Sequence, residues 1–251
     1  MPTPDLADTD RLLARLDRFD LTPEATGLRS RARELLRAGP DDTVVDVGCG
    51  GGRATAEIAA TGPRVVGVDL DQRMLDAARE RHPGPEFRHG DAYALPLAEG
   101  SVQGYRAEKV YHSLGDPARA LAEARRVLAP QGRLVLLGQD WDAYMVDSAD
   151  PALTRTIVSS YADGMPDPRA PRRQRALLLE SGFRDVEVEG RVLLFTDAQV
   201  LPMLAGLASA AVAAGAVCAE RAAAWVGEQR GRAEEGRLFV AIPFLLVSAA
   251  R

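Results

Sequence analysis

The chain has 251 residues, 46% of them hydrophobic and 27% charged, which is typical of a globular protein built on one large core. Its two cysteines exclude a disulfide scaffold and a C-x-x-C metal site. The formal net charge of −5 disfavours nucleic acid and anionic membrane as main partners, because both need a concentrated positive surface. We therefore expect a small-molecule partner, with a homodimer possible.

The first ten residues carry three aspartates and lack the basic and then apolar run of an export signal, so we expect a cytoplasmic location. The uncharged segment 198–219 is rich in alanine and interrupted by Pro202, Gly206 and Gly215. The free energy gained by transferring this segment from water into lipid is too small to hold it across a bilayer. We expect a buried helix there and no membrane association.

Strands and helices alternate along most of the chain. Apolar periodicity predicts helices over 5–18, 24–38, 54–61, 72–81, 118–128, 151–161 and 172–181, with a largely helical stretch over 198–231. Runs of β-branched and apolar residues predict strands over 43–47, 64–68, 86–89, 102–106, 133–137, 186–195 and 237–248. This alternation favours an α/β fold, in which helices cover both faces of a parallel sheet.

The positions of the predicted turns and looser segments indicate one domain over residues 1–251. It would consist of a helical cap over 1–38, a ligand-binding core over 41–140 and two lid insertions over 141–171 and 197–232. Pro243 lies inside the last predicted strand. A proline lacks the backbone N–H, so we expect that strand to lie at an edge of the sheet or to contain a bulge.

A glycine-rich loop follows the first predicted strand and opens the next helix. It reads Asp46-Val-Gly48-Cys49-Gly50-Gly-Gly52, and such a loop lets backbone N–H groups approach a ligand. The dinucleotide pattern G-x-G-x-x-G would need glycine at Arg53 or Thr55, which disfavours a nicotinamide or flavin cofactor. A purely structural turn is the alternative.

Two further acidic positions end the second and third strands. Asp69 lies 19 residues beyond Gly50, the spacing at which a carboxylate meets ribose hydroxyls in nucleotide-binding folds. Asp91-Ala92 closes the third strand. Asp69 could instead cap the following helix, a role for which Asp71 is the stronger candidate.

These three elements together resemble class I S-adenosylmethionine-dependent methyltransferases over roughly residues 41–140. The resemblance implies a Rossmann-like, doubly wound, seven-stranded sheet of order 3-2-1-4-5-7-6, with strand 7 antiparallel and helical lids. It also implies S-adenosyl-L-methionine as cofactor, with Asp46 helping to hold the ammonium end, Asp69 on the ribose, and Asp91 and Ala92 on the adenine. The residues expected to bind the cofactor are Asp46, Gly48, Cys49, Gly50, Gly52, Asp69, Leu70, Asp91, Ala92 and Glu108.

Methyl transfer to a hydroxyl or an acidic carbon requires a base. His112 follows the fourth strand, where some methyltransferases resembling this chain place a catalytic histidine; it could instead orient the acceptor or support the structure. Tyr111 could hydrogen-bond the acceptor or be a packed aromatic residue. Asp140, after the fifth strand, could act as auxiliary base, contact the substrate or cap a loop; we expect no metal there. Arg106 and Glu108 are expected to form an ion pair.

The sequence thus predicts methylation of a small molecule of the secondary-metabolite class, with oxygen or carbon slightly favoured as the methylated atom. One alternative keeps the fold and the cofactor but uses the bound sulfonium without transferring its methyl group, in a cyclisation or rearrangement. A second alternative is a non-catalytic ligand-binding protein.

Overall fold

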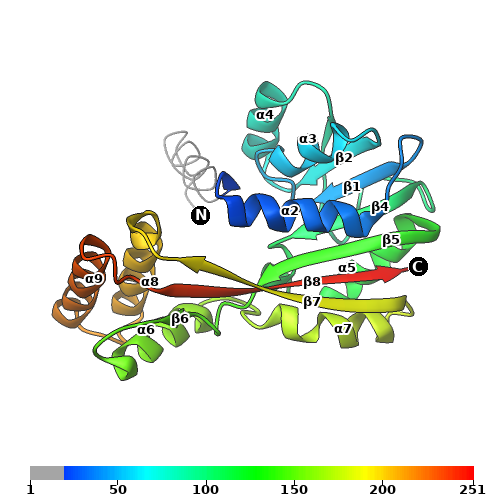
Figure 1. Cartoon of the computed structure of the whole chain (residues 1–251). Helices are drawn as coiled ribbons and strands as arrows, with labels where there is room; N and C mark the ends of the chain where they lie inside the picture. Colours follow the sequence, from blue (N-terminus) through cyan, green and yellow to red (C-terminus); the bar gives the residue numbers. More distant parts are fainter. Residues whose placement is uncertain (1–19) are drawn as a thin grey trace.

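The computed structural model describes residues 20–251, which form a central sheet with helices on both faces (Figure 1). The helix expected over 5–18 and the first half of the predicted cap lie outside the described residues. The strands are β1 Thr43–Val47, β2 Arg64–Asp69, β3 Glu86–His89, β4 Val102–Glu108, β5 Leu128–Gln139, β6 Met145–Val146, β7 Arg184–Phe195 and β8 Val240–Ala250.

The strand order confirms the predicted topology. It runs β3-β2-β1-β4-β5-β8, and β8 also pairs with β7 and with the short strand β6. The strands from β3 to β5 are parallel, whereas β8 is antiparallel to β5. The predicted order 3-2-1-4-5-7-6 therefore matches when β7 and β8 are counted as the sixth and seventh strands.

Helices cover the sheet because its parallel strands are apolar on both faces. In β5, Val135 and Leu137 pack in one core cluster with α2 (Pro23–Leu36), whereas Leu134 and Leu136 pack in the other with α5 (Pro117–Val127). This alternation follows from the period of two along a strand. The remaining helices of the sheet are α3 Arg53–Ala59, α4 Gln72–Arg81 and α7 Ala170–Glu180.

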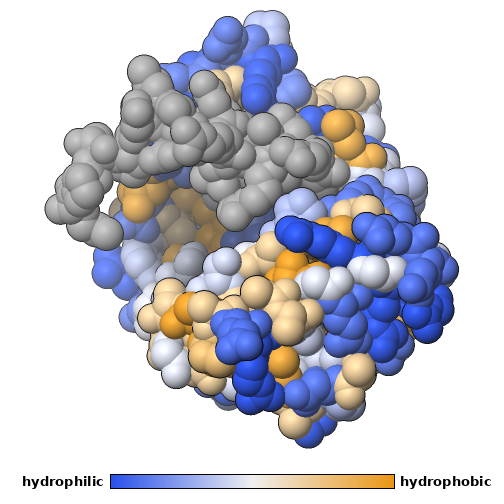
Figure 2. Space-filling model, turned by 90° about the vertical axis from the view of Figure 1, so that its left-hand side faces the viewer, coloured by the Kyte–Doolittle hydropathy of each residue, from blue (hydrophilic) through white to orange (hydrophobic). Residues whose placement is uncertain are grey.

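The two predicted lid segments come together in one helical lobe, formed by α6 (Pro151–Asp163), α8 (Leu201–Ala213) and α9 (Ala219–Glu234). The long strands β7 and β8 run side by side from the sheet toward this lobe (Figure 1). Trp225 of α9 is buried, and its Nε1 donates to Thr154 Oγ1 of α6 at 2.9 Å. Viewed from the α8–α9 end, the molecule is hollowed, and residues seen inside the hollow are apolar (Figure 2).

The position of Pro243 corrects one expectation, because β8 lies inside the sheet, between β5 and β7, and not at its edge. Its last pair with β5 is Gln139↔Phe244. Asp140 N donates to Pro243 O at 3.0 Å, so Pro243 lies where β5 leaves the sheet and its missing N–H removes no bond from the β5–β8 ladder.

Among the described helices, none combines the length and the apolarity needed to cross a membrane.

Candidate functional site

The glycine loop closes tightly against the neighbouring strand. Gly48 N and Cys49 N both donate to Val68 O, at 2.7 and 3.2 Å. Gly48 and Gly50 have φ of +68° and +52°, in the region that favours glycine. A Cβ at Gly48 would overlap Val110, whereas at Gly50 it would meet open space. The loop is therefore packed at Gly48 and open toward a ligand at Gly50.

Asp69 ties the loop to β2. Its Oδ2 accepts from Gly50 N at 2.8 Å and its Oδ1 accepts from Asp71 N at 2.9 Å. Leu70, which follows, is exposed. The capping role falls to Asp71, whose side chain accepts from Arg73 N at the start of α4. Asp69 thus lies next to the loop with carboxylate lone pairs left for a ligand.

The third element lies beside the second. Asp69 pairs with His89 in the β2–β3 register, and Gly90 N donates to Asp69 O at 3.0 Å. Asp91 Oδ1 accepts from Tyr93 N at 2.9 Å, and Ala92 is half-buried. The carboxyl ends of β1, β2 and β3 therefore bring the loop, Asp69 and Asp91 to one edge of the sheet, as expected for ligand sites of open α/β sheets.

A cavity of about 580 Å³ opens at the loop. Of the residues predicted from the sequence, it is lined by Gly48, Cys49, Gly50, Glu108 and His112. Gly52, Asp69, Leu70, Asp91 and Ala92 do not line this cavity. Burial raises the pKa of the Cys49 thiol, as do Asp46 and Asp69, so Cys49 is a packing residue of the loop and not a nucleophile.

Asp46 has a different place from the one expected. Its side chain is fully buried, Oδ1 accepts from Arg106 Nη1 at 2.7 Å, and Oδ2 accepts from Thr55 Oγ1 at 2.7 Å. Since both oxygens are occupied inside the protein, the expectation that Asp46 helps to hold the cofactor's ammonium group is corrected. Of the acids that were expected to bind the cofactor, Glu108 is the one that lines the cavity.

Glu108 forms the ion pair with Arg106 that the sequence predicts. Its other oxygen lies 3.3 Å from Lys109 Nζ. Burial alone would raise the pKa of Glu108, but Lys109, Arg106 and Arg29 together hold this pKa below its usual value. Glu108 is therefore an ionised carboxylate on the cavity wall.

Five charged residues of the cavity were missed by sequence reasoning: Asp20, Arg29, Arg53, Arg81 and Lys109. Asp20 Oδ1 lies 3.8 Å from Lys109 Nζ and 3.9 Å from Arg29 Nη1. Lys109 has φ +55°, an uncommon backbone conformation for a lysine, of the kind found at functional sites. Its place after the fourth strand was a usable signal, whereas Asp20 and Arg29 lie far away in sequence, just before α2 and within it.

Tyr111 is not at the cavity. It is buried among side chains on the α5 face of the sheet, and its hydroxyl lies 3.3 Å from that of Tyr105. Burial raises the pKa of Tyr111 well above its ordinary value. The interpretation as an acceptor contact is therefore wrong, because the 3-10 turn at Tyr111–Ser113 directs neighbouring side chains to opposite sides.

Asp140 is also enclosed. It is 5% exposed, and Arg172 of α7 donates to its carboxylate through Nε and Nη2. It also accepts from Asp142 N at 3.2 Å. Because an arginine holds both oxygens, Asp140 is not available as a base or substrate contact, and the loop-holding alternative fits. Its neighbour Trp141 lines the cavity instead.

His112 does face the cavity, beside Trp141, with ring centroids 5.5 Å apart. Burial lowers the pKa of His112, and Lys109 lowers it further, against an opposing effect of Asp167. The lowered pKa favours the neutral imidazole, which is the form able to accept a proton.

Comparison with known proteins agrees with this geometry. Residues 45–136 match the family model described as a methyltransferase domain. An uncharacterized 37.1 kDa protein in a transposon of Streptomyces fradiae is 35% identical over 244 residues, which cover 93% of this chain and 70% of that protein. A demethylmenaquinone methyltransferase from Renibacterium salmoninarum is 31% identical over 125 residues, 47% of this chain and 53% of that enzyme.

Residues 45–136 form a methyltransferase domain of the class I S-adenosylmethionine-dependent type. A solved putative methyltransferase from Bacillus halodurans has the same fold, with a TM-score of 0.61 and 20% identity over 88% of this chain and 97% of that one. The chain spans about half the length of the demethylmenaquinone methyltransferase that it matches.

The residues at the cavity suit S-adenosyl-L-methionine, the cofactor of this family. The open space at Gly50 admits a ligand to the loop backbone. The cavity also places the cations Lys109 and Arg53 beside the carboxylates Glu108 and Asp20, a donor set that fits both charges of a zwitterionic amino-acid group.

Proposed function

We propose that this chain methylates an oxygen or an acidic carbon of a small secondary-metabolite acceptor, with His112 as the general base. The observation that supports this most is the half-buried His112 imidazole on the wall of the cofactor cavity, where burial lowers its pKa. When bound, the cofactor supplies an activated methyl group on a sulfonium. The chain itself orients both partners, which lowers the barrier, and accepts one proton from the acceptor at His112.

The roles that we propose for the cofactor-binding residues are based on their positions around the cavity. The backbone of Gly48, Cys49 and Gly50 receives the amino-acid end, with Glu108 toward its ammonium group and Lys109 toward its carboxylate. Asp69 accepts from the ribose hydroxyls, and Asp91 with Ala92 meets the adenine edge. Because Asp46 holds Arg106 and Arg106 holds Glu108, Asp46 acts as a positioning residue.

Methyl transfer is tested by incubating the chain with cofactor labelled with a deuterated methyl group. Demethylmenaquinone, simple phenols and an extract of the source cells serve as acceptors, and mass spectrometry checks for a product that gains one labelled methyl. Cofactor that stays bound while a product forms without the label would favour the cyclisation or rearrangement alternative. Failure of the chain to bind S-adenosylhomocysteine in calorimetry would contradict the proposal.

Replacing Asp69 by alanine is expected to weaken S-adenosylhomocysteine binding at least about tenfold. The ribose loses a charged acceptor, and a hydrogen bond to a charged group contributes about 1.5–3 kcal/mol. Gly50 N also loses its partner. Isothermal calorimetry measures the change, and Asp76→Ala on the exposed side of α4 is the matched control. Equal affinities of the two variants would reject the ribose assignment.

The pH profile tests His112. The pKa of His112 is lowered by burial, so in a plot of kcat/KM against pH we expect an acid limb below the ordinary histidine value of about 6.5. Above that pKa the base is neutral and the rate is at its plateau; the rate falls as pH drops through it.

In His112→Gln this limb should disappear and turnover should fall by about 10²-fold or more, with cofactor affinity retained. His89→Gln, an exposed histidine outside the cavity, is the control. An unchanged acid limb in His112→Gln would remove His112 as the base.

A further inference from the structure

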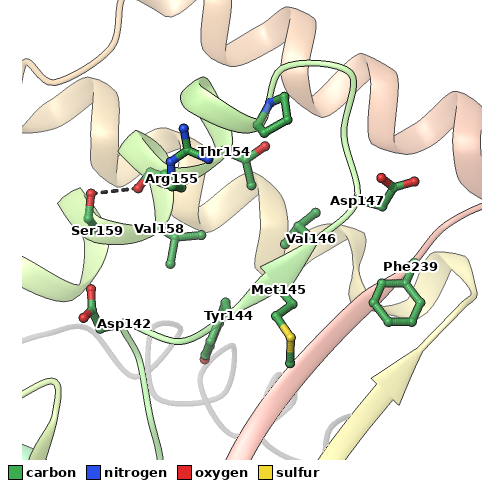
Figure 3. Close-up of a pocket in the computed structure, with 11 residues that line it drawn as sticks. Asp142, Tyr144, Met145, Val146, Asp147, Thr154, Arg155, Val158, Ser159 and Phe239 are labelled. Carbon is green, nitrogen blue, oxygen red and sulfur yellow. Dashed lines mark hydrogen bonds between the residues drawn. The ribbon is translucent and has the colours of Figure 1, made fainter.

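A second hollow lies in the helical lobe, away from the glycine loop. It is a groove of about 810 Å³ between α6 and the segment 142–147, with Phe239 just before β8 at its far side (Figure 3). We call it the α6 groove. None of the residues in the proposed methyl-transfer machinery lines it.

Apolar side chains line much of the α6 groove. Tyr144 and Val158 are buried in its wall, whereas Met145 and Phe239 are 47% and 41% exposed. Figure 3 shows Met145 on the strand and Val158 on the helix opposite it. Exposed large apolar side chains gathered in a concave site are typical of ligand binding, since packing does not require them there.

Within the part of the chain that the structure describes, the acidic residues of the groove are ion-paired, whereas its arginine is not. Asp142 accepts from Arg169 Nε at 2.7 Å, and Asp147 accepts from Arg232 Nη1 at 2.5 Å. Arg155 lines the same groove from α6 and is exposed. Within residues 20–251 its guanidinium has no carboxylate at ion-pairing distance. The groove therefore has a neutralised pair of acids and one cation open to an anionic ligand.

The groove adjoins the cofactor cavity through aromatic side chains. Trp141 lines the cavity, and its ring lies 6.0 Å from that of Tyr144, which lines the groove. The His112 ring also lies beside Trp141, with the ring centroids of His112 and Trp141 5.5 Å apart. A flat or linear molecule lying along these rings would join the proposed base to the groove.

We propose that the α6 groove binds an acidic amphiphile: an apolar body over Met145, Val158 and Phe239, with a carboxylate or similar anion on Arg155. This inference rests on the proposed function in one respect, because under it the amphiphile is the methyl acceptor, elongated enough to extend from the groove to His112. Arg155 is then a specificity-determining residue that selects acceptors with an acidic end.

The test uses dodecanoate and dodecan-1-ol, which share a chain length and differ in charge. Both are titrated calorimetrically, dodecanoate below its critical micelle concentration and dodecan-1-ol below its solubility limit. Wild-type chain should bind one dodecanoate and bind dodecanol about tenfold more weakly, as expected for loss of a charge-assisted hydrogen bond. Arg155→Met should bind both probes equally. Arg230→Met, on an exposed arginine of α9 outside the groove, should keep the wild-type preference.

The apolar part is tested with Met145→Glu, which should weaken both probes, against Leu179→Glu on the exposed side of α7, which should not. Equal binding of the two probes by wild type, or Arg155→Met behaving like Arg230→Met, overturns the inference. Titration with S-adenosylhomocysteine runs in parallel. If the chain binds dodecanoate but not S-adenosylhomocysteine, the proposed methyl transfer is rejected and the groove inference stands. If the chain binds S-adenosylhomocysteine but not dodecanoate, only the groove inference is rejected.

Discussion

Replacing Arg106 by methionine is expected to lower the free energy of unfolding by about 3–5 kcal/mol, the cost of leaving a buried charge without its partner. Arg106 is 3% exposed and Asp46 is fully buried, with Arg106 Nη1 2.7 Å from Asp46 Oδ1. Arg106 also binds Glu108. The substitution keeps an unbranched apolar stem but removes the guanidinium and leaves two carboxylates without their partner, so we also expect weaker cofactor binding.

Urea denaturation followed by circular dichroism measures the effect on stability. Arg64→Met is the matched control, because Arg64 pairs with Glu86 on the surface at 2.8 Å, with side chains 65% and 40% exposed. A pair of that kind contributes at most about 1 kcal/mol. If Arg106→Met does not fold, Asp46→Asn is measured in its place, since it removes the charge and keeps the shape. Equal losses for the buried and the surface variants would contradict the importance of the buried pair.

The second large effect is expected at the glycine loop, where Gly48→Ala should destabilise the chain by about 2–5 kcal/mol. The backbone at Gly48 has φ +68°, which costs a residue with a Cβ about 1–2 kcal/mol, and overlap with a packed neighbour adds about 1–3 kcal/mol. The new methyl would overlap the Val110 side chain. Because Val110 precedes the turn that holds His112, turnover should fall with stability.

Gly50→Ala separates the two causes. Its φ is +52°, and a Cβ there meets open space, so it should lose only the backbone contribution of about 1–2 kcal/mol. The added methyl points toward the ligand's approach, and we expect a larger loss of S-adenosylhomocysteine affinity than of stability. Thermal unfolding with and without S-adenosylhomocysteine measures both. A Gly48→Ala variant as stable as Gly50→Ala would refute the overlap with Val110.

The elements up to β5 were predictable from the sequence because their signals are local. The strand of valines at Thr43–Val47 ends at a glycine loop, and Arg64–Asp69 ends at an acid. In a parallel sheet the carboxyl ends of such strands share one edge, so placing Gly50 and Asp69 together needs only the order of strands. Apolar periodicity along the helices similarly predicted α2 and α5.

The direction in which a side chain points from a turn was less predictable. Tyr111 and His112 are neighbours in sequence, yet one is buried in the core and the other faces the cavity. Asp140 and Trp141 divide in the same way. In short turns the side chains follow no regular period, so a motif can identify the turn while leaving open which of its residues meets the ligand.

The sequence by itself determined the strands up to β5, the glycine loop and the acids that end the neighbouring strands, because each depends on residue type and periodicity within a few positions. The order of the strands was expected from the resemblance to the methyltransferases, and the structure confirms it. Only the tertiary structure decided that Asp46 is occupied by Arg106, that Asp20 and Arg29 reach the cavity, and that residues 141–171 and 197–232 share one lobe. Ion pairs and cavity walls join side chains from separate parts of the chain, and the burial of these side chains decides which charges remain accessible to a ligand. No local sequence pattern specifies such contacts between distant residues.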